Sequence, residues 1–261
     1  MTMTRRWMTM TFGMASAALG GIACERSQDP PPPTRVAPPA ASSASAPAPS
    51  ALRRTVSPEA TTSFLIAAPL EKIQGKATRA RGELVFEPAN LDASRGRVEL
   101  DLTTLTTFTF GDAEKDTKQT DHARNWLGLG PDVPAKEREE NQWVRFEIRE
   151  VKATPTRLAD APVVEGRRSV QLTANGELWL HGVTAKKSVR LAATFGGTPE
   201  APTDVRVQSV EALRLSMKEH DVKPRDLAGK FLQGALERVG DKIVDEVQVS
   251  IQIMATGAPG R

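Results

Sequence analysis

The sequence predicts an all-β fold of about eight antiparallel strands with one or two short helices. Apolar and polar residues alternate with a period of two in many separate segments, which is typical of strands that bury one face. Short connections join most of these segments, which favours antiparallel pairing of neighbouring strands. The chain has 261 residues, of which 39% are apolar, and this is enough for one domain with a substantial core.

The predicted strands follow one another between residues 61 and 254, beginning with short apolar segments at 64–67 and 84–86. The later strands have longer apolar faces, made of Val98, Leu100 and Leu102; Val144, Phe146 and Ile148; Val170, Leu172 and Ala174; Val189, Leu191, Ala193 and Phe195; Val205 and Val207; Leu213, Leu215 and Met217; and Val247, Val249, Ile251 and Ile253. Such a sheet must fold onto a second sheet or close on itself to hide this face, and periodicity leaves both arrangements open.

Two helices are expected among the strands. One covers residues 121–127, with Asp121 as its N-cap, and the other covers residues 224–239, where Pro224 suits a first turn and Gly240 suits the end. Residues 181–184 predict a hairpin connection. The polar, charged segment at residues 128–141 is expected to be an exposed insertion.

The N-terminal 23 residues are predicted to be a signal peptide. Arg5 and Arg6 form a positive start, and residues 12–23 are apolar and uncharged but too few to span a bilayer. Small residues before Cys24, the single cysteine of the chain, resemble a lipoprotein cleavage site at which Cys24 is acylated. Ordinary cleavage near Ala23, leaving a free thiol, is the alternative. Export predicts a periplasmic or cell-envelope location, and acylation predicts a membrane anchor.

Residues 24–60 are predicted to be a disordered linker rich in proline, alanine and serine. Large apolar residues are nearly absent from this segment, so it cannot bury enough surface to offset its chain entropy. We expect it to act as a semi-rigid spacer. The folded domain is then assigned to residues 61–254, followed by a C-terminal tail at residues 255–261.

The composition argues against several classes of function. Lys and Arg number 35 against 32 Asp and Glu, and Arg5 and Arg6 of the leader account for two of the three excess positive charges, so a dedicated nucleic-acid binder is not expected. One cysteine and three histidines favour neither a disulfide framework nor a metal site. The sequence also contains no nucleotide-binding glycine fingerprint and no Gly-x-Ser-x-Gly elbow.

The order of the motifs resembles the YceI-like family of secreted, lipocalin-like barrels. The resemblance rests on residues 82–91, 97–105, 121–127, 144–148 and 188–191, and above all on residues 178–184, which read Leu-Trp-Leu-His-Gly-Val-Thr. It covers residues 61–254 and implies an antiparallel barrel of about eight strands with no catalytic residues. Residues 128–131, Gly-Leu-Gly-Pro, depart from the aromatic residues usual there, so ligand entry is expected to differ.

The resemblance also implies an apolar channel that holds a long-chain amphiphile, such as a polyprenyl quinone, another isoprenoid or a fatty acyl lipid, without any covalent cofactor. The side chains assigned to the channel are Phe64, Phe86, Leu100, Phe146, Ile148, Leu178, Leu180, Leu191 and Phe195. Storage, transport or shielding of this ligand in the envelope is the predicted function. The alternative is a filled barrel that contacts an envelope protein or a second copy of itself.

The three histidines are candidate functional residues. His122 follows Asp121 and could act as a base, but adjacent residues rarely face the same point and no nucleophile accompanies them. His181 is predicted to be a turn residue. His220, beside Glu219 and Asp221, is predicted to lie in a solvated loop. No catalytic or metal-ligating residue is therefore assigned.

Overall fold

A computed structural model describes residues 51–67, 72–222 and 245–257. The leader, Cys24, most of the linker and the helix expected at residues 224–239 lie outside the described residues. The strands are β1 (Leu52–Val56), β2 (Thr61–Ala67), β3 (Lys72–Ala77), β4 (Ala80–Phe86), β5 (Arg95–Asp101), β6 (Thr106–Thr107), β7 (Trp143–Thr154), β8 (Val163–Val164), β9 (Arg167–Leu180), β10 (Val183–Gly197), β11 (Pro202–Ser209), β12 (Leu213–Ser216) and β13 (Glu246–Thr256). The helices are α1 (Ala113–Trp126) and α2 (Ala135–Asn141), with short 3₁₀ turns η1 (Leu91–Ala93), η2 (Leu102–Thr104), η3 (Leu158–Asp160) and η4 (Lys218–His220).

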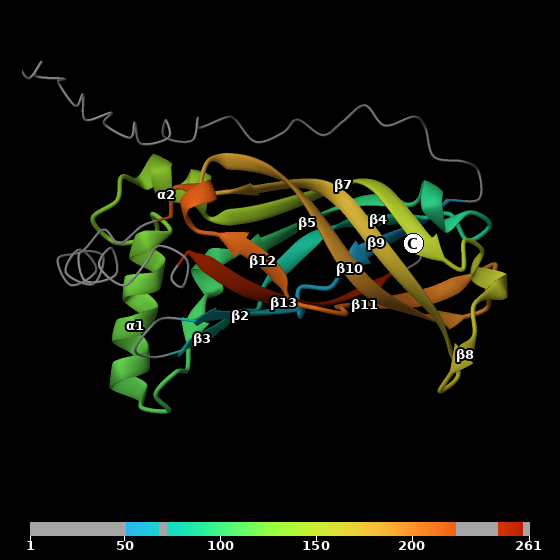
Figure 1. Ribbon diagram of the computed structural model, residues 1–261, viewed down its shortest axis with the longest axis horizontal. Helices are drawn as coiled ribbons and strands as arrows, with labels where there is room; N and C mark the ends of the chain where they lie inside the picture. The colour runs from blue at the N-terminus through green and yellow to red at the C-terminus, as the bar shows by residue number, and fades with distance from the viewer. Residues whose placement is uncertain (1–50, 68–71, 223–244, 258–261) are drawn as a thin grey trace, which may run out of the picture. The chain divides into compact units, whose positions relative to one another are not determined.

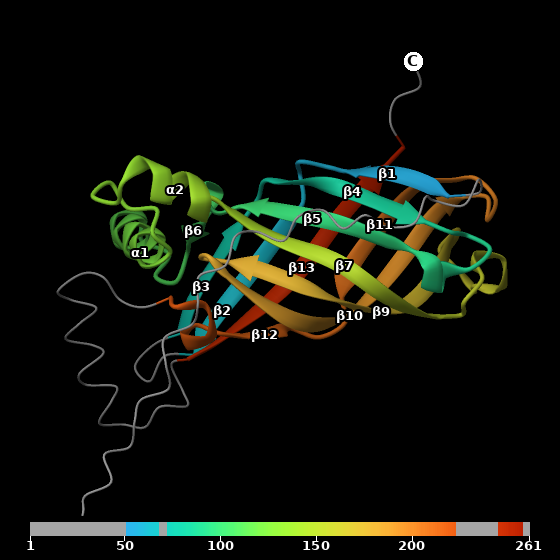
Figure 2. The same ribbon diagram turned by 90° about the horizontal axis from the view of Figure 1, so that it is seen from above.

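These segments form a closed antiparallel barrel of eight strands within the described part of the chain (Figures 1 and 2). Five of the eight barrel strands are interrupted, and each of these consists of two segments that follow one another in the chain. The five pairs of segments are β1 and β2, β3 and β4, β5 and β6, β7 and β8, and β11 and β12. Apart from the first and last strands, neighbours in the barrel are neighbours in sequence, and each pair is antiparallel. The predicted fold class, including the barrel implied by the family resemblance, is confirmed.

The barrel is closed by pairing between its first and last strands. Thr55 lies opposite Thr256, and Val56 lies opposite Ala255. Beside this closure, the Ser57 amide donates a hydrogen bond to the Met254 carbonyl over 2.7 Å. Pairing with β13 resumes at Thr61, where β2 begins. The first barrel strand, made of β1 and β2, therefore lies beside β13 along most of the length of β13.

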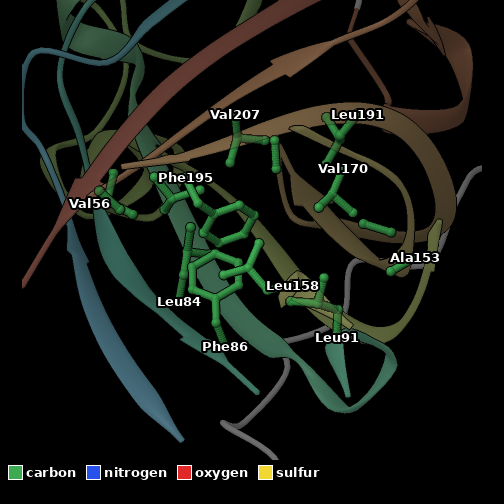
Figure 3. Packing of buried hydrophobic residues seen from close by; sticks show 14 of the residues in the cluster. Val56, Leu84, Phe86, Leu91, Ala153, Leu158, Val170, Leu191, Phe195 and Val207 are labelled. Carbon is green, nitrogen blue, oxygen red and sulfur yellow. The ribbon is translucent and has the colours of Figure 1, made fainter. Parts of the chain in front are cut away.

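One end of the barrel is filled by a packed apolar core (Figure 3). The rings of Phe86 and Phe195 meet edge to face, with centroids 5.3 Å apart. Leu91 of η1 and Leu158 of η3 are each only 1% exposed and plug this end from two connecting loops. The Leu158 amide donates to the Pro88 carbonyl over 2.9 Å, which ties the η3 plug to the loop after β4.

The predicted domain boundary at residue 61 is wrong, because β1 lies within the predicted linker. Arg53 and Thr55 point outward while Val56 is buried at 3% exposure, so this short strand alternates as the others do. Its length and its position after a proline-rich stretch hide that pattern. The last strand similarly extends to Thr256, two residues into the predicted tail.

The helix predicted at residues 121–127 is longer than expected and begins elsewhere. Helix α1 starts after Asp112, whose carboxylate accepts the amide hydrogens of Glu114 and Lys115 over 3.1 and 3.0 Å. Asp121 lies within the helix and does not cap it. None of the helices in the described residues is long and apolar enough to cross a membrane.

The segment at residues 128–141 is also less exposed than predicted. It contains α2, and Gly128, Gly130, Val133 and Asn141 are buried where it packs back on the domain. The charged residues between them, from Lys136 to Glu140, remain largely at the surface. The hairpin predicted at residues 181–184 is present, with His181 at φ 51° and Gly182 at φ 78° turning β9 into β10.

Candidate ligand cavity

The interior of the barrel beyond the packed core contains an apolar cavity of about 580 Å³. This is nearly four times the roughly 150 Å³ of an apolar cavity that stays dry and admits benzene. It also falls within the range of about 300–1,000 Å³ typical of small-molecule sites. Among its described wall residues, the polar ones are Thr62, Ser94, Lys115, Lys118, Gln119, His122 and Ser216, and all others are apolar.

All nine side chains assigned to a channel from the sequence lie on the wall of this one cavity. Phe64 comes from β2, Phe86 from β4, Leu100 from β5, Phe146 and Ile148 from β7, Leu178 and Leu180 from β9, and Leu191 and Phe195 from β10. The strands place them together because every second residue of each strand faces inward. Their contact with a ligand stays a prediction.

Gly75 of β3 lets an aromatic ring lie flat against the wall. A Cβ atom at this position would lie 2.2 Å from Cζ of Phe64 and 2.7 Å from the Thr106 carbonyl oxygen. Any side chain at residue 75 would therefore push Phe64 farther into the cavity. Glycine here preserves the cavity volume at the expense of some strand stability.

Helix α1 lies at one end of the barrel (Figures 1 and 2), and side chains from this helix line the cavity. Ala123 and Trp126 near the helix C-terminus extend the apolar lining, while Lys115 and Lys118 lie toward the helix N-terminus. Both lysines are exposed, as is His122, which directly precedes Ala123. The wall thus changes along this helix from apolar to basic. Sequence reasoning missed this part of the site, because a largely polar helix has no apolar stripe. The sequence feature that could have indicated the start of this helix is Asp112 as an N-cap, followed by Glu114 and Asp116 in the first turn.

The outer face of the barrel carries a charged cluster around Glu99 of β5, which is 5% exposed. Its carboxylate accepts hydrogen bonds from Arg81 and Arg97, each at 2.5 Å, and lies 2.9 Å from Nε of Arg145. Burial raises the pKa of Glu99, but the bonds and charges of Arg81 and Arg97 outweigh it and hold the pKa below its usual value. Arg81 in turn stacks 3.7 Å from the ring centre of Trp143. The cluster binds β4, β5 and β7 together and faces away from the cavity.

The predicted solvated environment of His220 is wrong. The side chain is fully buried, because the turn η4 directs it against the β9–β10 hairpin. Nδ1 of His181, itself 1% exposed, lies 3.1 Å from the His220 carbonyl oxygen, so the two residues join η4 to the hairpin. Burial lowers the pKa of His220, which favours its neutral form.

The described residues bring together no metal-binding group of three or more histidine, cysteine or acidic side chains. His122 lines the cavity, as do Lys118 and Gln119 of the same helix. What this arrangement offers chemically is burial of apolar surface, with basic groups at one end.

The chain is similar to a known domain family and to solved structures. The family model for the YceI-like domain matches residues 55–255. A domain from Saccharophagus degradans, described as a polyisoprenoid-binding domain implicated in plant cell wall breakdown, shares 12% identity, with 79% of this chain and 98% of that one covered and a TM-score of 0.50. Burkholderia cenocepacia BcnA shares 13% identity over 76% of this chain and 96% of its own, with a TM-score of 0.46.

No curated protein sequence matches the chain significantly. The match to the family model covers nearly the whole barrel, from Thr55 near the end of β1 to Ala255 in β13. The chain therefore belongs to the family of YceI-like domains.

Proposed function

We propose that the domain binds a long-chain amphiphile, such as a polyprenyl quinone, another isoprenoid or a fatty acyl lipid, and stores, carries or shields it in the cell envelope. The observation that carries this proposal is the wall of the cavity, which is apolar except at its α1 end and Thr62, Ser94 and Ser216. Membership of the YceI-like family supports it, as does the similarity to the Saccharophagus degradans domain, which is described as polyisoprenoid-binding.

The mechanism is sequestration by burial. An apolar chain that leaves water for this cavity gains about 25 cal/mol for each Å² of its surface that becomes buried. The rigid strands supply a preformed site, so little ordering of the protein opposes binding. No residue needs to form or break a bond, and we propose no catalytic activity.

The proposal predicts that a bulky side chain in the cavity abolishes ligand binding. Ile251 of β13 lines the cavity, whereas its neighbour Gln252 is exposed on the outer face. The I251W variant should lose bound lipid, measured by native mass spectrometry and organic extraction, while Q252W keeps it. Equal lipid content in both variants, or a bare unchanged chain after incubation with quinones and fatty acids, would contradict the proposal. The second result favours a filled barrel with a protein partner.

We also propose that the chain is exported and anchored through acylated Cys24. The apolar leader and the small residues before this cysteine support that proposal. Labelled palmitate should enter the unchanged chain and not a C24S variant. Labelling of both would refute acylation at Cys24.

A further inference from the structure

Backbone pairing around the barrel is interrupted between β10 and β12. Strand β10 pairs with β11 from Leu191 onward, and the Val210 amide donates a hydrogen bond to the Arg190 carbonyl over 3.0 Å. Beyond that bond, within the described residues, residues 183–189 of β10 pair only with β9, and β12 pairs only with β13. We call the unpaired stretch between residues 183–189 and β12 the seam.

The seam arises where β11 passes into β12. Gln208 lies opposite Gln252 and Leu213 lies opposite Val249, so five steps along one strand match three steps along β13. Two extra residues are therefore accommodated between β11 and β12. Extra residues of this kind bend a strand and disrupt its ladder locally. The bend keeps β12 paired with β13 and ends its pairing with β10.

Lys187 of β10 is a sign of the seam in the sequence. It precedes Val189 and Leu191 by two and four residues, and because both of these line the cavity, strand alternation directs Lys187 to the same face. Its ammonium group forms an ion pair with Glu219 of η4, and its side chain is 15% exposed. A lysine at such a position in a continuous wall would have to bury its charge. At the seam, it reaches a carboxylate instead.

A groove follows the seam on the outside of the barrel. It is lined by residues 186–190 of β10, by residues 211–214 and by Gln248 of β13. Val189 and Leu213 line both this groove and the apolar cavity, one from each side of the seam. These two apolar side chains therefore separate the groove from the cavity at a place where no backbone ladder joins β10 to β12 in the described chain.

The seam can open without loss of a described strand pairing. Elsewhere, the separation of two paired strands breaks several backbone hydrogen bonds at once. The ion pair between Arg190 and Glu211 crosses the seam over 3.6 Å, but its side chains are 61% and 60% exposed, so water screens it. Rotation of Val189 and Leu213 and separation of this surface pair are the changes that opening requires.

We propose that the apolar tail of the ligand enters and leaves the cavity sideways, through the seam between Val189 and Leu213. This passage rests on the proposed function, because it concerns the same ligand. The polar head of an amphiphile need not cross the apolar wall, since the groove outside offers polar groups, among them Lys186, Ser188 and Gln248. Only the tail passes between the two apolar side chains.

The test measures how fast the full chain, freed of lipid on a hydrophobic resin, takes up and releases the fluorescent fatty acid cis-parinaric acid in a stopped-flow instrument. The V189A and L213A variants should each raise both rate constants by about threefold or more, since rates depend exponentially on the barrier and smaller side chains lower it.

The matched controls V207A and L172A make the same two changes in the cavity wall, on strands that are paired on both sides at these residues. A change of the wall away from the passage alters the stability of the bound state. These controls should therefore change the release rate constant without raising the uptake rate constant.

Two outcomes would overturn the seam as the route. If V189A and L213A take up the probe no faster than V207A and L172A, the ligand enters elsewhere, for example at the α1 end. If the unchanged chain binds no probe in an equilibrium titration, the proposed function fails and the passage fails with it. Thermal unfolding separates a local effect from general loosening. Faster uptake by a seam variant that unfolds at the same temperature as its control supports the seam.

Discussion

His220 shows how a single buried residue links the domain to pH. It is fully buried at η4, with Glu219 and Lys187 as its charged neighbours, and its pKa lies below the ordinary value of 6.5 because of burial. The unfolded chain therefore takes up a proton at a higher pH than the folded one. Its contribution to stability is complete above about pH 6.5 and is lost as the pH falls toward the pKa of the folded protein.

We expect the free energy of unfolding to fall as the pH is lowered from about 8 to about 5. The H220Q variant should show a smaller fall over that range, because it removes the group that charges on unfolding. Urea unfolding at each pH measures this slope. The matched variant H122Q changes an exposed histidine of α1 and serves as the comparison. An identical slope in H220Q would show that other groups control the acid response.

At the scale of elements, the sequence predicts long strands well and short or polar elements poorly. The alternation of Val247, Val249, Ile251 and Ile253 identifies β13 because eleven residues repeat the same pattern. Strand β3 reads Lys-Ile-Gln-Gly-Lys-Ala, and its glycine and two lysines conceal the alternation. Most of the nine cavity residues lie on strands with a clear alternation, whereas Phe64 and Phe86 lie on the shorter strands β2 and β4.

The part of the site contributed by α1 could not be predicted in the same way. Its side chains meet the cavity through tertiary packing, and the helix itself is mostly polar. His220 was misplaced for a related reason, since a charged local sequence gives no sign that its histidine turns inward. Both errors concern segments whose burial is decided by distant elements.

The position of the α1 cap can be tested directly. We expect D112A to lower the free energy of unfolding by about 1 kcal/mol, because two amide hydrogens lose their acceptor. The variant D121A removes the residue that the sequence suggested as the cap and should change stability by only a few tenths of a kcal/mol. Chemical denaturation of both variants distinguishes the two assignments. A larger loss in D121A than in D112A would reverse them.

At the scale of the whole molecule, the barrel depends on its first strand. Strand β1 pairs with β4 on one side and β13 on the other, and Val56 and Ala60 are each 3% exposed. A chain that starts at residue 61 should therefore leave two open edges and unfold or aggregate, whereas one that starts at residue 51 should unfold cooperatively. Size-exclusion chromatography and thermal unfolding would compare them. A cooperative, monomeric chain from residue 61 would show that the closure is dispensable.

The same closure sets an order of events for a newly made chain. Every other pair of neighbouring strands is adjacent in sequence, so each hairpin can form as soon as its second strand has been synthesised. The pairing of Thr55 with Thr256 must wait for nearly the entire chain. Until then the growing sheet has two unsatisfied edges and an open apolar concavity. The last step of folding is consequently the one that encloses the cavity, and a ligand present at that moment would be enclosed without having to enter the completed barrel.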